Sequence, residues 1–223
     1  MSDAPLVPTP VYGLRTWTVR GERPDERLGG AYRDTAPWPT GGAWLEASCS
    51  GAEGHSAPAP QCGCGVHAWH PRPDAARRIL DRRRQVPGIV EACGEIEVHE
   101  DGFRAERARP YALLLAPGRN AALAHRLGEA YQVPVVEAAG PDEVLRWCRE
   151  HGLGLGAPVV AELLGADELE AQRRARKARV RTGALRVTAA FVLAALLVVL
   201  GLLATDKPGD RTLSGRAGEV RTR

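Results

Sequence analysis

The chain has 223 residues, which is room for one medium or two small folded domains and a further short segment. Its net charge of +3 hides an asymmetry: residues 1–172 carry 18 basic and 24 acidic side chains (net −6), and residues 173–223 carry 12 basic and 3 acidic ones (net +9). A nucleic-acid-binding domain would carry its basic face on the folded body, so this distribution argues against one.

The first 70 residues are irregular and contain four of the five Trp. Short alternating stretches at 11–19 and 43–48, with frequent Gly and Pro between them, predict short strands and long loops packed around aromatic side chains. The first residues show neither the basic nor the apolar segment of a secretory signal. We therefore expect the part ahead of the membrane anchor predicted at 187–204 to stay in the reducing cytoplasm, where Cys side chains are metal ligands or buried thiols rather than disulfides.

A metal site is predicted between residues 49 and 70, where three of the five Cys and several His fall within 22 residues. Cys49, His55, Cys62 and Cys64 supply three thiolates and one imidazole, the number and softness of ligands for a closed tetrahedral zinc site. Cys62 and Cys64 are separated only by Gly63, a tighter chelate than the usual C-x-x-C.

Other interpretations of this stretch stay open. His67 or His70 can replace a ligand, the thiolates can hold an iron-sulfur cluster, or the Cys can be small buried thiols without metal. Glu46 or Glu53 could act as a general base beside a metal, although the usual zinc-hydrolase and deaminase signatures are absent. The two remaining cysteines lie in apolar patterns and are predicted core residues: Cys93 and Cys148.

Downstream of the Cys/His stretch the pattern becomes regular. An arginine-rich helix is predicted over 72–84, with a solvated charged face that can also touch phosphate or lipid. Residues 86–108 predict a hairpin around an Asp-Gly turn at 99–102. Residues 111–156 alternate strand, helix, strand and helix, which predicts a small α/β unit with two parallel strands.

The last part of the chain predicts a membrane anchor. Residues 157–186 have the composition of a juxtamembrane helix, acidic first and basic afterwards. Residues 187–204 are 18 residues without a charge, which as a helix span about 27 Å, roughly one hydrocarbon core. A disordered tail is predicted over 205–223.

The basic residues ahead of the predicted span set its orientation. By the positive-inside rule they place the N-terminal part in the cytoplasm, in a single-pass protein of the cell membrane, and they contact anionic lipid headgroups. These lipid-contacting residues are Arg173, Arg174, Arg176, Lys177, Arg179, Arg181 and Arg186.

Residues 11–110 contain the motifs Y-G-L-R-T-W at 12–17, A-S-C at 47–49, H-S-A-P at 55–58 and C-G-C-G at 62–65. In this C...H...CxCG arrangement they resemble a family of proteins from high-GC bacteria that has no assigned activity. The layout is also similar to membrane-bound zinc anti-sigma factors, which place a Cys/His domain before one membrane helix but use H-x-x-x-C-x-x-C. The resemblance implies no activity.

Together the patterns predict an α+β fold of five parts. These are a β-rich Cys/His domain (1–110), a small α/β unit (111–156), a juxtamembrane helix (157–186), a transmembrane helix (187–204) and a tail (205–223). The predicted function is a membrane-anchored cytoplasmic binding or regulatory module with a structural zinc site and a cytoplasmic protein partner. The alternatives are a redox or metal sensor that uses the same cysteines, and an enzyme whose site carries none of the known signatures.

Overall fold

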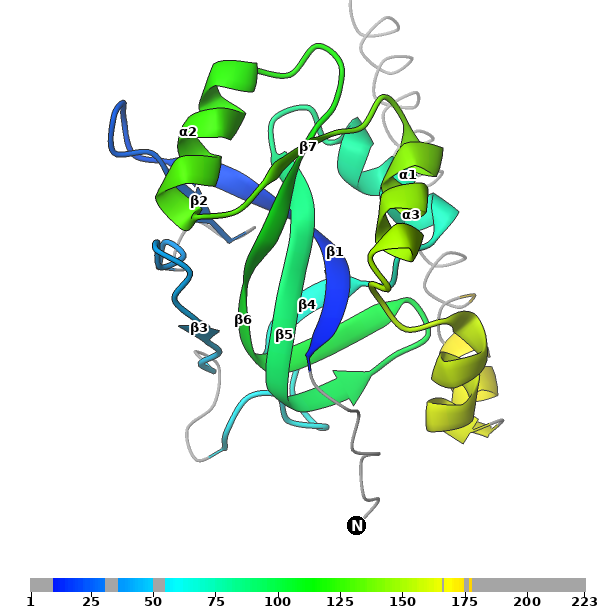
Figure 1. Ribbon diagram of the computed structural model, residues 1–223. Helices are drawn as coiled ribbons and strands as arrows, with labels where there is room; N and C mark the ends of the chain where they lie inside the picture. The colour runs from blue at the N-terminus through cyan, green and yellow to red at the C-terminus, as the bar shows by residue number, and fades with distance from the viewer. Residues whose placement is uncertain (1–9, 31–35, 50–54, 166, 175–176, 178–223) are drawn as a thin grey trace, which may run out of the picture. The chain divides into compact units, whose positions relative to one another are not determined.

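The computed structural model describes residues 10–30, 36–49, 55–165, 167–174 and 177. Their α+β architecture confirms the predicted class (Figure 1). The strands are β1 (Val11–Arg20), β2 (Arg27–Gly29), β3 (Leu45–Glu46), β4 (Val66–Trp69), β5 (Val86–Val98), β6 (Gly102–Leu115) and β7 (Val135–Glu137). The helices are α1 (Pro73–Asp81), α2 (Ala121–Tyr131) and α3 (Pro141–Glu150), and residues 157–165 and 167–174 are helical too.

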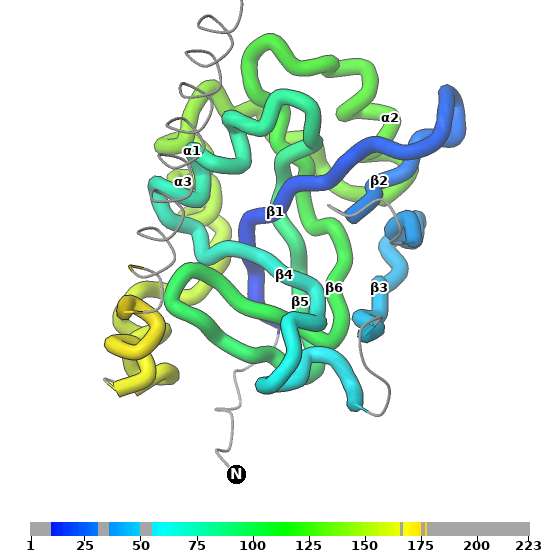
Figure 2. The backbone as a smooth tube through the Cα atoms, turned by 180° about the vertical axis from the view of Figure 1, so that it is seen from behind, coloured from blue at the N-terminus to red at the C-terminus, as the bar shows by residue number. Residues whose placement is uncertain are grey.

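Four strands close on themselves. β1 pairs with β5, β5 with β6, β6 with β4 and β4 with β1, all antiparallel, so their edges are largely used up within the ring. Outside this ring, β2 pairs antiparallel with β1, β3 pairs antiparallel with β6, and β7 pairs parallel with β6. Figure 2, the view from behind, shows β4 crossing in front of β5 and β6, and its pairing with β6 brings the loop ahead of it against that strand.

The predicted hairpin is confirmed, but its second arm is much longer than expected. Its turn is closed by two hydrogen bonds between His99 and Gly102 (2.8 and 3.3 Å). β6 then runs on through Pro110, across the boundary expected between residues 110 and 111. Pro110 lacks an N–H, and it lies beside a register shift between Ile89 and Val90 of β5, where a proline costs no regular ladder bond.

The α/β unit forms as predicted. β6, α2, β7 and α3 follow one another, and Leu113 to Leu115 of β6 lie in parallel register with β7. The side chain of Asn120 caps α2 by accepting the N–H of Leu123 (3.0 Å), and Pro141 starts α3. This unit shares its sheet with the N-terminal strands, and the described residues up to Gln172 belong to one compact unit.

Two apolar clusters pack against the strands, and in Figure 1 α2 lies on one side of the strands and α1 and α3 on the other. On the α2 side, Trp17 and Trp38 pack edge to face with ring centroids 5.4 Å apart. The buried hydroxyl of Tyr131 accepts the N–H of Leu28 (2.8 Å) and donates to the carbonyl of Trp38 (3.0 Å). The α1 and α3 side buries Leu14, Ile79, Ile89, Leu114, Val144 and Cys148.

The predicted core cysteines differ in burial. Cys148 is fully enclosed, and burial raises the pKa of its thiol to about 11. Cys93 is half-buried in β5, because the strand bends there at a second register shift between Cys93 and Ile96. The core assignment is confirmed for Cys148 and only partly met by Cys93.

The membrane-facing part of the prediction falls largely outside the described residues. Within the described ranges no helix is both long and apolar enough to cross a membrane. The predicted span at 187–204, the tail and four of the basic residues (Arg176, Arg179, Arg181 and Arg186) lie outside those ranges. Arg173, Arg174 and Lys177 are described as exposed helical residues.

Candidate metal centre

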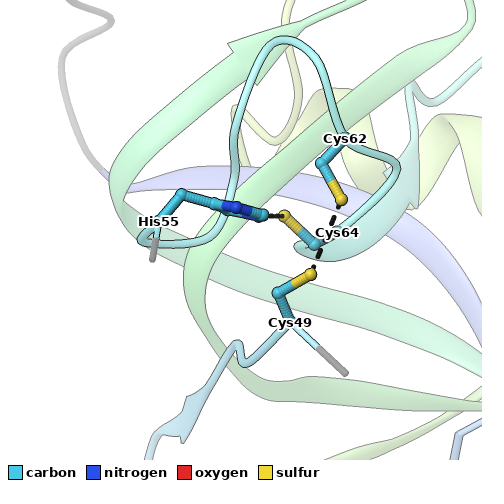
Figure 3. A group of neighbouring side chains, drawn as sticks. All are labelled: Cys49, His55, Cys62 and Cys64. Carbon is cyan, nitrogen blue, oxygen red and sulfur yellow. Dashed lines mark hydrogen bonds between the residues drawn. The ribbon is translucent and has the colours of Figure 1, made fainter. Parts of the chain in front are cut away.

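Cys49, His55, Cys62 and Cys64 converge on one point (Figure 3). Their ligand atoms all lie within 4.8 Å of one another, and all four side chains are half-buried. Cys49 Sγ lies 3.6 Å from Cys62 Sγ, and Cys64 Sγ lies 3.4 Å from Nε2 of His55. The cluster can therefore hold a metal ion.

The spacing of these atoms suits a tetrahedral ion of zinc's size. With Zn–S bonds of about 2.3 Å and Zn–N bonds of about 2.0–2.1 Å, tetrahedral angles put two sulfurs about 3.8 Å apart and a sulfur and a nitrogen about 3.6 Å apart. The Cys49–Cys62 and Cys64–His55 pairs, at 3.6 and 3.4 Å, fall within a few tenths of an ångström of those edges. Only small side-chain shifts are needed for all four ligands to contact one ion.

The ligands come from two segments of chain. Cys49 follows β3, a strand of two residues, whereas the other three lie in the loop that leads into β4. In that loop the N–H of Cys62 donates to the carbonyl of Ala59 (2.9 Å), and Gly65 has a φ of +112°. A Cβ at Gly65 would lie 3.1 Å from Cβ of Arg104 and 3.2 Å from Cβ of Pro58. Gly63, between the two cysteines, has open space around it. The loop therefore requires a glycine at position 65 and not at position 63.

Arg104 holds the ligand loop against the sheet. It is buried in β6, opposite His67 of β4. Its Nη1 donates to the carbonyl oxygens of Cys62 and Cys64, the latter at 3.0 Å, and its Nη2 donates to Ala59 (3.4 Å) and pairs with Glu97. One guanidinium thus orients the backbone on both sides of Gly63. Sequence reasoning missed this residue, because β6 carries three arginines (Arg104, Arg107 and Arg109) and the residue pattern does not distinguish the buried one.

His67, considered above as an alternative ligand, is not part of the cluster. Its Nε2 donates to the carbonyl of Gly63 (2.9 Å), so it supports the ligand loop instead. Burial lowers the pKa of His67, and the nearby Arg15 and Arg104 lower it further, which keeps the ring neutral near pH 7.

His70 also has a different role. It is completely buried, and its Nε2 donates to the carbonyl of His99 (2.9 Å) at the hairpin turn. Burial lowers the pKa of His70. Neither His67 nor His70 therefore replaces His55 in the described cluster.

The thiols influence one another's ionisation. The backbone N–H of Cys64 lowers the pKa of Cys62, but the neighbouring thiols of Cys49 and Cys64 and partial burial together outweigh it, so the pKa of Cys62 is raised. Gathering several thiols without a cation disfavours their thiolate forms, because each new negative charge repels the next. A bound divalent cation reverses this balance by favouring deprotonated thiolates.

Nothing beside the cluster suggests a substrate site among the described residues. Glu46 is an exposed residue of β3, and Glu53 lies outside the described ranges. Two open surface depressions lie elsewhere: one runs along α1, and the other lies beside α2, where His125 and Glu129 line it.

Comparison of the chain with protein-family models, with curated proteins and with solved structures finds no match.

Proposed function

We propose that the chain is a membrane-anchored binding or regulatory module whose folded part is braced by a zinc ion on Cys49, His55, Cys62 and Cys64. The observation that carries the zinc centre is the gathering of three thiol sulfurs and one imidazole nitrogen within 4.8 Å. Thiolate and imidazole ligands favour zinc, whereas magnesium and calcium prefer oxygen ligands. Four protein ligands leave no coordination position open, which is the arrangement of a structural zinc ion.

Such an ion would join segments that few other contacts connect. β3 is bonded to β6 over only two residue pairs, extended by the bond from the N–H of Ala47 to the carbonyl of Glu106 (2.7 Å). The loop with the other three ligands is held separately by Arg104. Zinc would fix Cys49, and with it the segment around β3, to this loop.

Metal analysis of the full-length chain tests the zinc centre. The chain, purified in mild detergent under reducing conditions, should carry about one zinc ion. Cobalt substitution should give thiolate charge-transfer absorption that Cys62→Ser weakens. Cys93→Ser is the matched control, because Cys93 lies in β5 outside the cluster, and it should leave both measurements unchanged. Metal below about 0.2 per chain in the unmodified protein would refute the zinc centre.

Membrane anchoring is supported by residues 187–204. Six Leu, four Val and Phe191 contribute on the order of −3 to −7 kcal/mol to insertion. We expect the chain to stay in membranes after carbonate washing, and protease to digest its folded part in inverted vesicles but not in spheroplasts. Recovery of the full chain as a soluble monomer without detergent would refute the anchor.

A second candidate function, a redox-controlled zinc site, is favoured by one distance. Cys49 and Cys62 are half-buried, and their sulfurs lie 3.6 Å apart. With hydrogen peroxide as oxidant, one thiolate would attack a peroxide oxygen and release hydroxide to give a sulfenic acid, and the second thiolate would displace a second hydroxide from that sulfur. The two thiolates would lose two electrons to the peroxide, two protons would complete two water molecules, and the zinc ion would leave.

Zinc release during peroxide treatment separates the two candidates. A redox site should release zinc in step with formation of a Cys49–Cys62 disulfide, detected by peptide mass spectrometry. A purely structural centre should keep its zinc under peroxide concentrations that oxidise an accessible reference thiol.

A further inference from the structure

One surface of the folded unit carries a charge opposite to that of the rest. Within residues 72–84 there are six Arg and two Asp, a net charge of +4. The remainder of residues 1–172 has 12 basic and 22 acidic side chains, a net charge of −10. We call the exposed arginines of this stretch the α1 arginine face: Arg77, Arg78, Arg82, Arg83 and Arg84.

The fold directs this face outward. α1 buries Ala75, Ala76 and Ile79 against the sheet, so the arginines on its other side are left in solvent. The guanidinium carbons of Arg78 and Arg82 lie 5.9 and 5.6 Å from the centre of the Trp69 ring. One indole therefore holds two cations side by side.

Arg119 covers the carbonyl end of α1, which would otherwise repel an anion. The last carbonyls of a helix carry partial negative charge. Arg119, from the loop ahead of α2, donates to the carbonyl oxygens of Leu80 (2.5 Å), Arg82 (3.1 Å) and Gln85 (3.0 Å). The end of α1 is therefore covered by a cation, and the adjoining surface is positive.

The arginines of this face form no ion pair among the described residues, although Arg82 donates a hydrogen bond to the side chain of Gln85 (3.3 Å). Asp74 and Asp81 line the same open depression as Arg77, Arg78 and Arg82, but among the described residues neither forms an ion pair with them. The described ion pairs of the unit lie elsewhere, such as Arg104 with Glu97 and Arg126 with Glu26.

We propose that the α1 arginine face docks the folded unit on an anionic membrane surface, in an inference that rests on the membrane anchor proposed above. Guanidinium groups bind phosphate with paired hydrogen bonds, and a half-buried Trp such as Trp69 suits the headgroup region. Fourteen residues separate Gln172 from residue 187, which keeps the unit within about 50 Å of the bilayer even if fully extended. Tethering supplies a high local concentration of lipid phosphate, so weak individual contacts suffice.

Arginine labelling of the full chain in lipid nanodiscs tests this docking. Discs of neutral phosphatidylcholine are compared with discs containing anionic phosphatidylglycerol, using a dicarbonyl reagent and peptide mass spectrometry. In anionic discs we expect labelling of the α1 arginine face to slow by at least about threefold, and the slowing to disappear at high salt. Arg23 is the internal control, because it lies in the exposed β1–β2 turn, away from α1 in both views (Figures 1 and 2), and its labelling should not change.

A charge variant adds a second readout. Arg77→Gln combined with Arg82→Gln removes two exposed cations without changing the buried face of α1, and it should abolish the difference between the two kinds of disc. Arg23→Gln is the matched control and should preserve it.

The outcomes separate this docking from the anchor. A chain that inserts into discs but is labelled equally in both kinds refutes the docking and leaves the anchor intact. If the chain does not insert, the anchor fails, and cosedimentation with anionic vesicles then decides the docking: binding lost in Arg77→Gln/Arg82→Gln supports it, and no binding refutes it. Protection of the face by an oligonucleotide but not by anionic lipid would also refute it.

Discussion

Replacement of Arg104 by Met should loosen the ligand loop more than any other single change outside the four ligands. Met keeps much of the buried aliphatic volume but removes the guanidinium that donates to Ala59, Cys62 and Cys64. It also removes the arginine partner of Glu97, whose side chain is 22% exposed, and leaves only His99 beside that carboxylate, at 3.2 Å. Hydrogen bonds from charged donors contribute about 1.5–3 kcal/mol each, but these share one group. We therefore expect Arg104→Met to lower the free energy of unfolding by about 3 kcal/mol, which is the lower end of the range for breaking a buried ion pair.

Arg104→Met should also weaken the affinity of the cluster for zinc. Residues that orient metal ligands from outside the coordination shell typically change affinity by about 10–100-fold, and Arg104 orients two of the four ligand residues through their backbone. Denaturant unfolding of the zinc-loaded chain measures the change in the free energy of unfolding. Competition with a chromophoric zinc chelator measures the change in zinc affinity.

Arg107→Met is the matched control on the same strand. Arg107 lies 3.8 Å from Glu106, both side chains are about 40% exposed, and an exposed pair contributes about 0–1 kcal/mol. If Arg104→Met and Arg107→Met had equal effects on stability and on zinc affinity, the role assigned to Arg104 would be wrong.

Three further predictions follow from the described contacts. Tyr131→Phe should lower the free energy of unfolding by about 1–3 kcal/mol in urea titrations, because the buried N–H of Leu28 and carbonyl of Trp38 lose their partner, whereas Tyr111→Phe should have a smaller effect. Cys148, with a pKa of about 11 and a buried thiol, should react with iodoacetamide at pH 8 only when the protein unfolds, whereas half-buried Cys93 should react faster in pulse-labelling experiments. Burial lowers the pKa of His70 below the unfolded value of about 6.5, so the unfolded state binds more protons and stability should fall as pH drops through about 6.5. His70→Gln should flatten that part of the stability profile, and an unchanged slope would show that His70 does not cause it.

Local patterns in the sequence determine the regular elements of this protein. The Asp-Gly turn at 99–102, the cap at Asn120 and the proline at the start of α3 act through hydrogen bonds and backbone limits within a few residues. These signals need no distant contact. The hairpin, the parallel pair of β6 and β7 and the order of helices were therefore predictable.

Contacts between distant residues decided what the sequence left open. A boundary was expected between residues 110 and 111, but the register shift opposite Pro110 in β5 lets β6 continue and join both predicted parts in one sheet. His67 and His70 had the right chemistry for metal, yet the register of β4 against β6 directs them to carbonyl oxygens of Gly63 and His99. Arg104 contacts a loop more than 40 residues earlier. Residue types and spacing determined which ligands were available, and the strand pairing decided which of them meet, because only tertiary structure fixes distances between segments far apart in the chain.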